Sequence, residues 1–259
     1  MDLKLNDKRA VVTGGSRGIG LAVGTALARE GAAVALVGRD GRVAQEQAAK
    51  LAAATGARVI GIAADTGDDA SVAAMAAAAE ERLGGVDILV NNAARTNPGV
   101  ILVSALEEEI NVKVRGYLRC ARSFAPGMVE RGWGRIINIG GTAARRTGSV
   151  VGSVRNVAVA ALTKNLADEL GPQGVNVTVV HPGATSTETG TKALAANAAA
   201  RGLTLEEVQR EFAASISIGR IVTPDEVAAV VAFLASPLSV ALNGDPLIAS
   251  GGALGPIYY

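Results

Sequence analysis

Cysteine, histidine and aromatic residues are scarce in this chain of 259 residues. Cys120 is the only cysteine, His181 is the only histidine, and aromatic residues make up 3% of the sequence. A single cysteine excludes an intramolecular disulfide framework and a cysteine-rich metal site. A single histidine excludes a metal site built from several imidazoles. The sequence therefore predicts no metal centre.

The chain also lacks an excess of charge of either sign and a long apolar run. Its 25 Lys and Arg residues balance 24 Asp and Glu residues, so no basic surface indicates a nucleic-acid partner. The longest uncharged apolar stretch, 227–243, is interrupted by Ser236 and Pro237 and is shorter than the roughly 20 residues of a membrane-spanning helix. The first ten residues mix charges and lack the apolar region of a signal peptide. We expect a soluble, cytoplasmic protein without a membrane partner.

Small and apolar residues are abundant, and short β-branched runs alternate with longer Ala-rich stretches. Hydrophobic residues account for 49% of the chain, which rules out a disordered protein. Strands are predicted at residues 9–13, 33–37, 59–63, 86–91, 135–139, 175–180 and 247–249. Helices are predicted after the first strand as far as Gly31, then at about 41–54, 69–82, 111–131, 152–170 and 204–214, and from Thr223 onward.

Such short, almost wholly apolar strands, separated by helices, are typical of a parallel sheet covered on both faces. Connections between parallel strands are right-handed, so the alternation predicts a doubly wound α/β fold. No linker, repeat or low-complexity tract divides the chain. We therefore predict a single domain over residues 1–259.

A glycine-rich turn follows the first predicted strand and opens a helix. Residues 13–20 read Thr-Gly-Gly-Ser-Arg-Gly-Ile-Gly. Glycines at this place let the backbone approach a pyrophosphate, and the free N–H groups of the helix N-terminus face its negative charge. A purely structural turn would explain one of the glycines. The turn predicts a dinucleotide site formed by Gly14, Ser16, Arg17, Gly18, Ile19 and Gly20.

The turn and several later motifs resemble, in the same order, those of the short-chain dehydrogenase/reductase family. Residues 91–94, Asn-Asn-Ala-Ala, are similar to the family's Asn-Asn-Ala-Gly motif, and residues 65–68 to its adenine-binding acidic segment. Residues 181–183, His-Pro-Gly, followed by Thr187, resemble its Pro-Gly turn and nicotinamide-binding threonine. The resemblance covers about residues 5–253 and implies a Rossmann fold with a nicotinamide cofactor. It adds further cofactor-binding residues, namely Asp65, Asn91, Ala93, Pro182, Gly183 and Thr187.

The choice between the two nicotinamide cofactors depends on the end of the second predicted strand. A carboxylate there would bind the ribose 2′-OH of NAD and repel a 2′-phosphate. That position is Gly38, Arg39 follows it, and Arg17 lies in the glycine turn. Two guanidinium groups can form bidentate, charge-assisted hydrogen bonds to a phosphate, although both arginines have an alternative reading as ordinary surface residues. We predict NADP(H) as the cofactor, with NADPH preferred over NADH.

Three of the four catalytic residues that the resemblance implies are absent. The family uses a Ser, a Tyr-x-x-x-Lys pair and an Asn. The alignment places Gly141 at the Ser position, Gly152 at the Tyr position and Asn156 at the Lys position. Asn111 alone keeps its family identity. We therefore predict a degenerate active site.

Other polar residues in the same region are candidates for the missing roles. Arg155 and Asn156 lie on the predicted helix 152–170, where Arg155 could hold a carbonyl oxygen or a substrate carboxylate. His181 follows a strand at the edge where sites form in this fold class, and its ordinary pKa suits a general acid. A hydrogen-bonded structural histidine is the alternative. The catalytic candidates are thus Asn111, Asn156, Arg155 and His181, and the segment 188–218 is predicted to cover the substrate cleft as a lid.

Three functions are compatible with these residues. The first is an NADP(H)-dependent oxidoreductase that acts on the carbonyl or alcohol group of a small molecule through an atypical site. The second is a catalytically silent NADP-binding subunit or sensor, paired with an active relative, and the third is non-redox chemistry on the same scaffold. The resemblance also implies a homo-tetramer or dimer built on the helices at 111–131 and 152–170. Candidate packing positions are Val112, Val114, Val157 and Val159, for which ordinary core packing is an equal reading.

Overall fold

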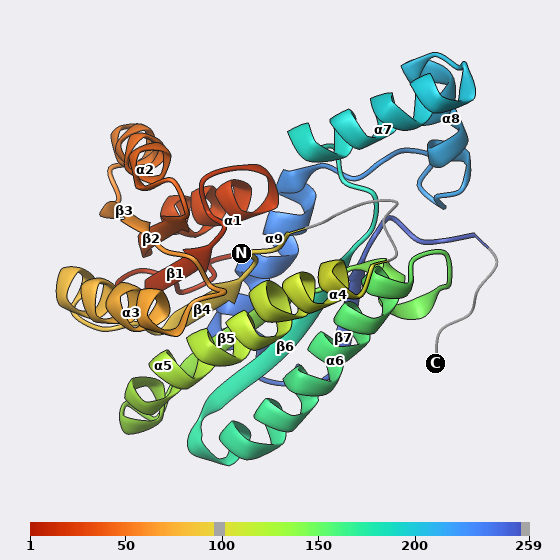
Figure 1. Ribbon diagram of the computed structural model, residues 1–259. Coiled ribbons are helices and arrows are strands. Elements are labelled where there is room, and N and C mark those ends of the chain that lie inside the picture. The colour runs from red at the N-terminus through yellow and green to blue at the C-terminus, as the bar shows by residue number, and fades with distance from the viewer. Residues whose placement is uncertain (96–101, 255–259) are drawn as a thin grey trace.

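A computed structural model describes residues 1–95 and 102–254. Within these ranges, seven parallel strands form one sheet in the order β3-β2-β1-β4-β5-β6-β7 (Figure 1). The strands are β1 Arg9–Thr13, β2 Ala33–Gly38, β3 Val59–Ala63, β4 Ile88–Asn91, β5 Gly134–Ile139, β6 Val175–Pro182 and β7 Pro246–Ala249. The predicted doubly wound α/β fold is confirmed.

Helices cover both faces of the sheet. They are α1 Gly18–Arg29, α2 Gly41–Thr55, α3 Asp69–Leu83, α4 Val103–Glu109, α5 Gly116–Glu130, α6 Val150–Leu170, α7 Glu188–Arg201, α8 Leu205–Ala214 and α9 Pro224–Ala235. Helices α3, α5 and α6 pack on one face, and α1, α2 and α9 pack on the other. Helices α7 and α8 extend away from the sheet (Figure 1). In the described part of the chain, none of the helices is both long enough and apolar enough to cross a membrane.

The two layers of core follow from the alternation of side chains along each strand. In β1, Val11 belongs to the core beneath α3 and α5, and its neighbour Val12 belongs to the core beneath α1 and α9. Leu89 and Val90 of β4 divide in the same way. Successive strand residues point to opposite faces, so a sheet buried on both faces requires an unbroken apolar run.

Most predicted boundaries are confirmed within two residues, and the largest difference concerns the helix predicted at 111–131. Helical structure begins at Val103 and continues to Glu130 through a π-helical segment, Ile110–Arg115. Such segments are rare and are often found at functional sites. A second difference lies in residues 188–201, where no helix is predicted and the structure contains α7.

Candidate functional site

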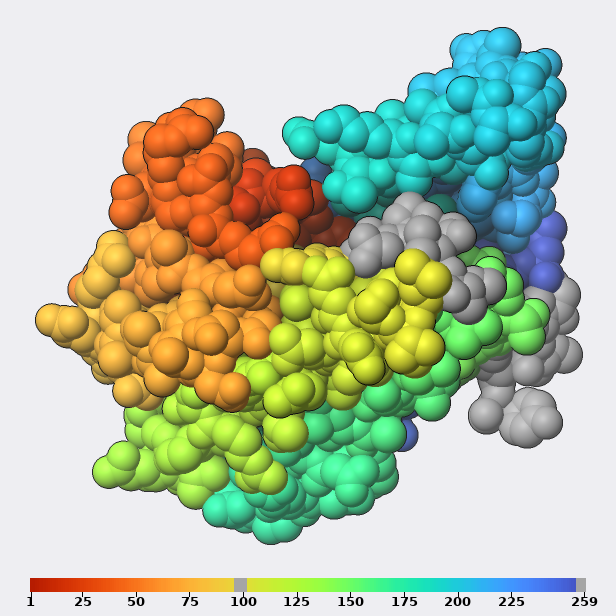
Figure 2. Space-filling model, in the orientation of Figure 1, coloured from red at the N-terminus to blue at the C-terminus, as the bar shows by residue number. Residues whose placement is uncertain are grey.

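A cleft of about 1010 Å³ lies at the carboxyl ends of β1, β2 and β4. The strand order reverses at this point of the sheet, and ligands bind there in open α/β folds. Figure 2 shows the hollow between the red and orange N-terminal part and the cyan helix α7. We call it the nucleotide cleft. The predicted cofactor-binding residues that line it are Gly14, Ser16, Arg17, Gly18, Ile19, Arg39, Asp65, Ala93 and Thr187.

The glycine turn at one end of the nucleotide cleft has the geometry of an anion cradle. Gly14 and Gly18 have φ of +62° and +54°, a conformation that favours glycine. A Cβ atom on Gly20 would lie 2.2 Å from the carbonyl oxygen of Gly14, so this position requires glycine for close packing. Asn92 fixes the turn, since its Nδ2 donates to the carbonyl oxygens of Thr13 and Gly14 at 3.0 and 3.1 Å.

The amino end of α1 also suits a phosphate. The residue that precedes α1, Arg17, forms no side-chain cap, so the N–H groups of the first turn have no side-chain acceptor from that residue. Unpaired N–H groups at a helix N-terminus bind phosphate oxygens. The turn and the helix together fit the pyrophosphate of a nicotinamide dinucleotide.

The residues at the end of β2 determine whether a carboxylate or a positive charge faces the ribose 2′ position of a nicotinamide cofactor. Gly38 ends the strand without a carboxylate, and Arg17 and Arg39 are exposed on the wall of the cleft. Asp40 also lines the cleft, but its carboxylate accepts hydrogen bonds from the N–H groups of Arg42 and Val43 and caps α2. The one acidic side chain close to Gly38 in sequence is thus engaged by the helix.

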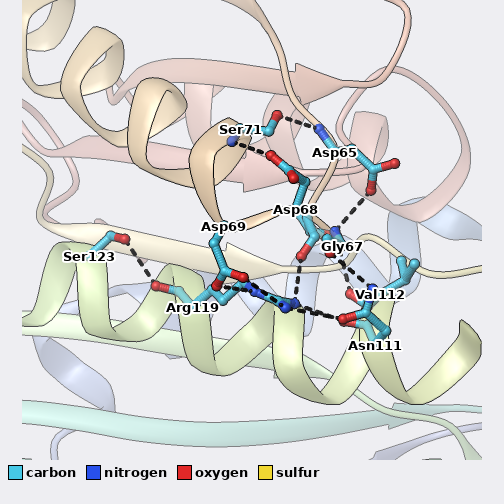
Figure 3. Close-up of polar contacts among 10 residues, drawn as sticks. Asp65, Gly67, Asp68, Asp69, Ser71, Asn111, Val112, Arg119 and Ser123 are labelled. Atoms are coloured by element: carbon cyan, nitrogen blue, oxygen red, sulfur yellow. Dashed lines mark hydrogen bonds and ion pairs between the residues drawn. The ribbon is translucent and has the colours of Figure 1, made fainter. Parts of the chain in front are cut away.

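The acidic segment after β3 is tied to the helix that carries Asn111 (Figure 3). Asp65 accepts a hydrogen bond from the N–H of Gly67 at 2.8 Å. The side chain of Asn111 donates to the carbonyl oxygen of Gly67 at 2.9 Å and accepts from Arg119 at 3.1 Å. Asn111 therefore braces the wall of the nucleotide cleft, and the structure does not bring it together with Asn156 or His181.

Two of the other predicted cofactor residues are buried in the sheet. The side chain of Asn91 is fully buried and donates to Asn138 Oδ1 at 2.9 Å, linking β4 to β5. Its neighbours Asn92 and Ala93 line the cleft instead. Pro182 is the last residue of β6, and Gly183 lines a second, smaller hollow.

The second hollow has a volume of about 70 Å³ and lies beyond the ends of β6 and β7. Its walls include Thr142, Arg145 and Arg146 after β5, and Phe212 and Ile216 from the α8 region. The segment 188–218, predicted as a lid, borders both hollows. Glu188 and Thr189 line the nucleotide cleft, and Phe212 and Ile216 line the second hollow.

At the carboxyl ends of β5 and β6, the structure brings Asn156 and His181 together with Lys113. The Nζ of Lys113 donates to the carbonyl oxygen of Gly140 and to Oδ1 of Asn156, both at 3.0 Å. The N–H of Gly141 donates to Nδ1 of His181 at 2.9 Å. A Cβ atom on Gly141 would lie 3.1 Å from Asn156 Nδ2, so the position aligned with the catalytic serine faces the position aligned with the lysine.

The charged groups of this cluster perturb one another. Burial and the neighbouring Arg155 lower the pKa of Lys113 to about 7, against a smaller opposing effect of Glu109. Burial lowers the pKa of His181 to about 4, and the positive charges of Lys113 and Arg145 add to this effect. His181 is therefore neutral at pH 7 and accepts a backbone hydrogen bond, so it holds no extra proton to give as an imidazolium.

Arg155 is committed to a buried ion pair. Its guanidinium is bonded to the carboxylate of Glu109 and donates to the carbonyl oxygen of Arg95 at 3.0 Å. The side chain of Arg155 is 13% exposed and that of Glu109 is 3% exposed. The pair fastens α6 to α4 beside the cluster.

Lys113 is the residue of this site that the sequence analysis does not single out. It lies four residues before Tyr117 and seven before Cys120, both of which are buried. Residues at such spacings share one face of a helix. A lone lysine on the apolar face of the helix predicted at 111–131 is the signal that could have found it.

Comparisons with known proteins agree with the fold and identify the family. A family model described as enoyl-(acyl carrier protein) reductase matches residues 14–253. The short-chain reductase protein NovJ of Streptomyces niveus is 37% identical over 94% of this chain and 92% of its own. The 3-oxoacyl-[acyl-carrier-protein] reductase FabG of Aquifex aeolicus is 32% identical over 97% of this chain and 99% of its own.

A solved structure extends the likeness to three dimensions. The L-sorbose reductase of Gluconobacter frateurii, crystallised with NADPH and L-sorbose, superposes with a TM-score of 0.93 at 30% identity, covering 99% of this chain and all of the other. The matches span nearly the full length of each protein. The chain belongs to the short-chain dehydrogenase/reductase family of oxidoreductases.

Proposed function

We propose that this protein is an NADP(H)-dependent oxidoreductase that acts on the carbonyl or alcohol group of a small molecule through an atypical catalytic site. The observation that carries the proposal is the nucleotide cleft, which combines an anion cradle with two exposed arginines and no carboxylate at Gly38. The L-sorbose reductase that resembles this chain was solved with NADPH, which supports the same cofactor here.

The residues of the cleft divide into four tasks. NADP(H), when bound, would exchange a hydride with the substrate carbon. The N–H groups after Gly14 and at the start of α1 would hold the pyrophosphate, and Arg17 and Arg39 the 2′-phosphate. Asp65 would bind the adenine, and Ala93 and Thr187 would orient the nicotinamide end.

Calorimetric titration of the purified chain tests the cofactor. We expect NADPH to bind at least about tenfold more tightly than NADH, since a charge-assisted pair contributes about 1.5–3 kcal/mol. Arg39→Ala should remove most of this preference. Arg42→Ala is the matched control, because Arg42 is equally charged, lies three residues away and pairs with Glu46 on α2 rather than lining the cleft. Equal affinities for NADPH and NADH in the wild type would contradict the proposal.

Turnover tests the reaction. The wild type, with NADPH, should reduce at least one member of a panel of ketoses, β-keto thioesters, quinones and aldehydes. NADPH binding with no reduction of any panel member would favour the second candidate, a silent subunit, for which Gly141 and Gly152 at the serine and tyrosine positions are the supporting observation. Activity restored by a co-purified relative would then decide for that candidate.

Two further features complete the proposal. The segment 188–218 would act as a lid, because its first residues border the nucleotide cleft and Phe212 and Ile216 border the second hollow. The chain would also self-associate through α6. Val159 is fully buried and Val112 is 6% exposed, so both pack within the subunit, whereas Val157 is 51% exposed.

A further inference from the structure

Lys113 carries a buried amine that has no part in the packing of the sheet or in the proposed cofactor site. Its residue is 4% exposed, and it lies in the middle of the π-helical segment Ile110–Arg115. Its Nζ has two acceptors, the carbonyl oxygen of Gly140 and Oδ1 of Asn156. Both acceptors are neutral. Burying an ammonium group costs free energy that neutral acceptors offset only in part.

Within residues 1–95 and 102–254, Lys113 forms no ion pair with a carboxylate, and Glu109 acts on it only through its charge. Glu109, the nearest acidic group that influences it, is bonded to Arg155. The other titratable groups packed around the amine are His181 on β6 and Tyr117 on α5, whose hydroxyl donates to the carbonyl oxygen of Ile139. A lysine retained among neutral acceptors and a second cation points to a chemical use.

The chain neighbours and hydrogen-bond acceptors of Lys113 connect it to the walls of both hollows. Its neighbour in the chain, Val112, lines the nucleotide cleft, and its acceptor Gly140 lies two residues before Thr142, which lines the second hollow. Lys113 itself lines neither hollow, and its hydrogen bond joins the segment beside the nucleotide cleft to the strand end that leads to the second hollow. Because Gly141 has no side chain, the Asn156 amide packs against this position, where an added Cβ would lie 3.1 Å from Nδ2.

We propose that Lys113 is the acid–base residue of this site, giving its Nζ proton to the oxygen of a carbonyl substrate during reduction. The inference rests on the proposed function. As the hydride adds to the carbonyl carbon, a C–H bond forms, the C=O π bond becomes a lone pair on oxygen, and that oxygen takes the proton from Nζ. The nicotinamide is oxidised, the carbonyl is reduced, and the neutral amine regains a proton from solvent.

Two properties of Lys113 suit this task. An ammonium group has three N–H donors, and within residues 1–95 and 102–254 two acceptors are found, which leaves the third N–H for a substrate oxygen. A pKa of about 7 lets the group exchange its proton near neutral pH, where general acids work best. Burial and the charge of Arg155 lower this pKa, so the folded structure itself brings the amine into the range needed for proton transfer.

The first test needs no turnover. Wild-type protein labelled with ¹⁵N and ¹³C at lysine should show one of its six lysine signals titrating near pH 7, and this signal should vanish in Lys113→Met. The lysines are Lys4, Lys8, Lys50, Lys113, Lys164 and Lys192. If all six titrate near the ordinary lysine pKa, the inference is overturned.

The second test compares variants at saturating NADPH. Lys113→Met should lower kcat for carbonyl reduction by about 10²–10⁴-fold, leave the calorimetric Kd for NADPH unchanged, and abolish the fall in wild-type kcat as pH rises through 7. Lys113→Arg keeps the charge but holds its proton, so it should keep the fold without restoring kcat. Restoration by arginine would indicate a structural cation and overturn the inference. Lys164→Met, on the exposed side of α6, is the control and should behave as wild type.

The outcomes separate the inference from the proposed function. Wild-type turnover that Lys113→Met leaves intact overturns the role of Lys113 alone. A wild type that fails to bind NADPH, or binds it and reduces no carbonyl, overturns the proposed function and the role of Lys113 with it.

Discussion

The Nζ atom of Lys113 lies 3.0 Å from Oδ1 of Asn156, the residue aligned with the lysine of the family's catalytic pair. The amine reaches this place from the π-helical segment rather than from α6. A positive charge is thus retained at the site although the lysine of α6 is replaced. Asn156 has a shorter side chain than lysine, and its Oδ1 accepts the hydrogen bond from Lys113 Nζ.

This pairing predicts that a lysine at position 156 lowers the stability of the folded protein. Asn156→Lys removes an acceptor and places a second ammonium beside Lys113, and an uncompensated buried charge costs about 3–5 kcal/mol. We expect that loss in the free energy of unfolding, measured by urea denaturation at pH 6. It should be smaller at pH 9, where Lys113 is neutral. The double variant Lys113→Met/Asn156→Lys should regain most of the stability, and equal losses in the single and double variants would refute the pairing.

His181 predicts a loss of stability in acid. Its pKa is lowered to about 4 in the folded protein, so between pH 6.5 and 4 the unfolded chain binds a proton that the folded chain does not. Stability from this residue is complete above pH 6.5 and falls by up to about 3 kcal/mol as the pH drops to 4. His181→Gln keeps an acceptor for the N–H of Gly141 and does not titrate. Urea unfolding at pH 7.5 and 4.5 should therefore show a larger loss for the wild type than for this variant.

Gly20 predicts a coupled loss of stability and cofactor binding. Alanine there would bring Cβ within 2.2 Å of the Gly14 carbonyl oxygen and within 2.5 Å of Asn92 Nδ2, so the turn must open. We expect a loss of about 3 kcal/mol and no measurable NADPH binding by calorimetry. Gly56→Ala is the control, because Gly56 has φ of +72° with no atom within 4 Å of the added Cβ. It should cost about 1 kcal/mol and leave binding intact.

The exposed valines of α6 give a test of the proposed self-association. Val150, Val154 and Val157 are 57%, 46% and 51% exposed and follow one another along one helical face. Val157→Lys should shift the protein from a dimer or tetramer toward the monomer in analytical ultracentrifugation, because burying a lysine in an apolar contact is costly. Gln45→Lys, on an exposed position of α2, adds the same charge away from the valines and should leave the assembly unchanged. A wild type that sediments as a monomer would exclude self-association.

Local residue patterns predicted the strands, most of the helices and the nucleotide cleft, because each depends on short-range signals. The apolar runs mark the strands, and the glycine turn marks the cradle directly. The sequence could not show that the Asn91 side chain enters the sheet while Asn92 secures the turn, since both carry the same side chain and only the register of β4 separates them.

The cluster of Lys113, Asn156 and His181 is predicted less completely, because it depends on packing between distant elements. Alignment to the family points to Asn156, and the place of His181 after a strand at the edge where sites form points to His181. Lys113 contacts Asn156 across 43 positions of sequence, and the π-helical segment that carries it has no simple sequence signature. The sequence suggests that Arg155 could hold a carbonyl oxygen or a substrate carboxylate, and its bond to Glu109 becomes visible only when α4 and α6 are placed side by side.

One covalent segment forms a wall of both hollows: it begins at Thr187 beside the nucleotide cleft and reaches Ile216 beside the second hollow. The two hollows therefore share a wall that is continuous in the chain. A ligand that shifts this segment at one hollow would change the free energy of binding at the other, and such coupling is equal in both directions.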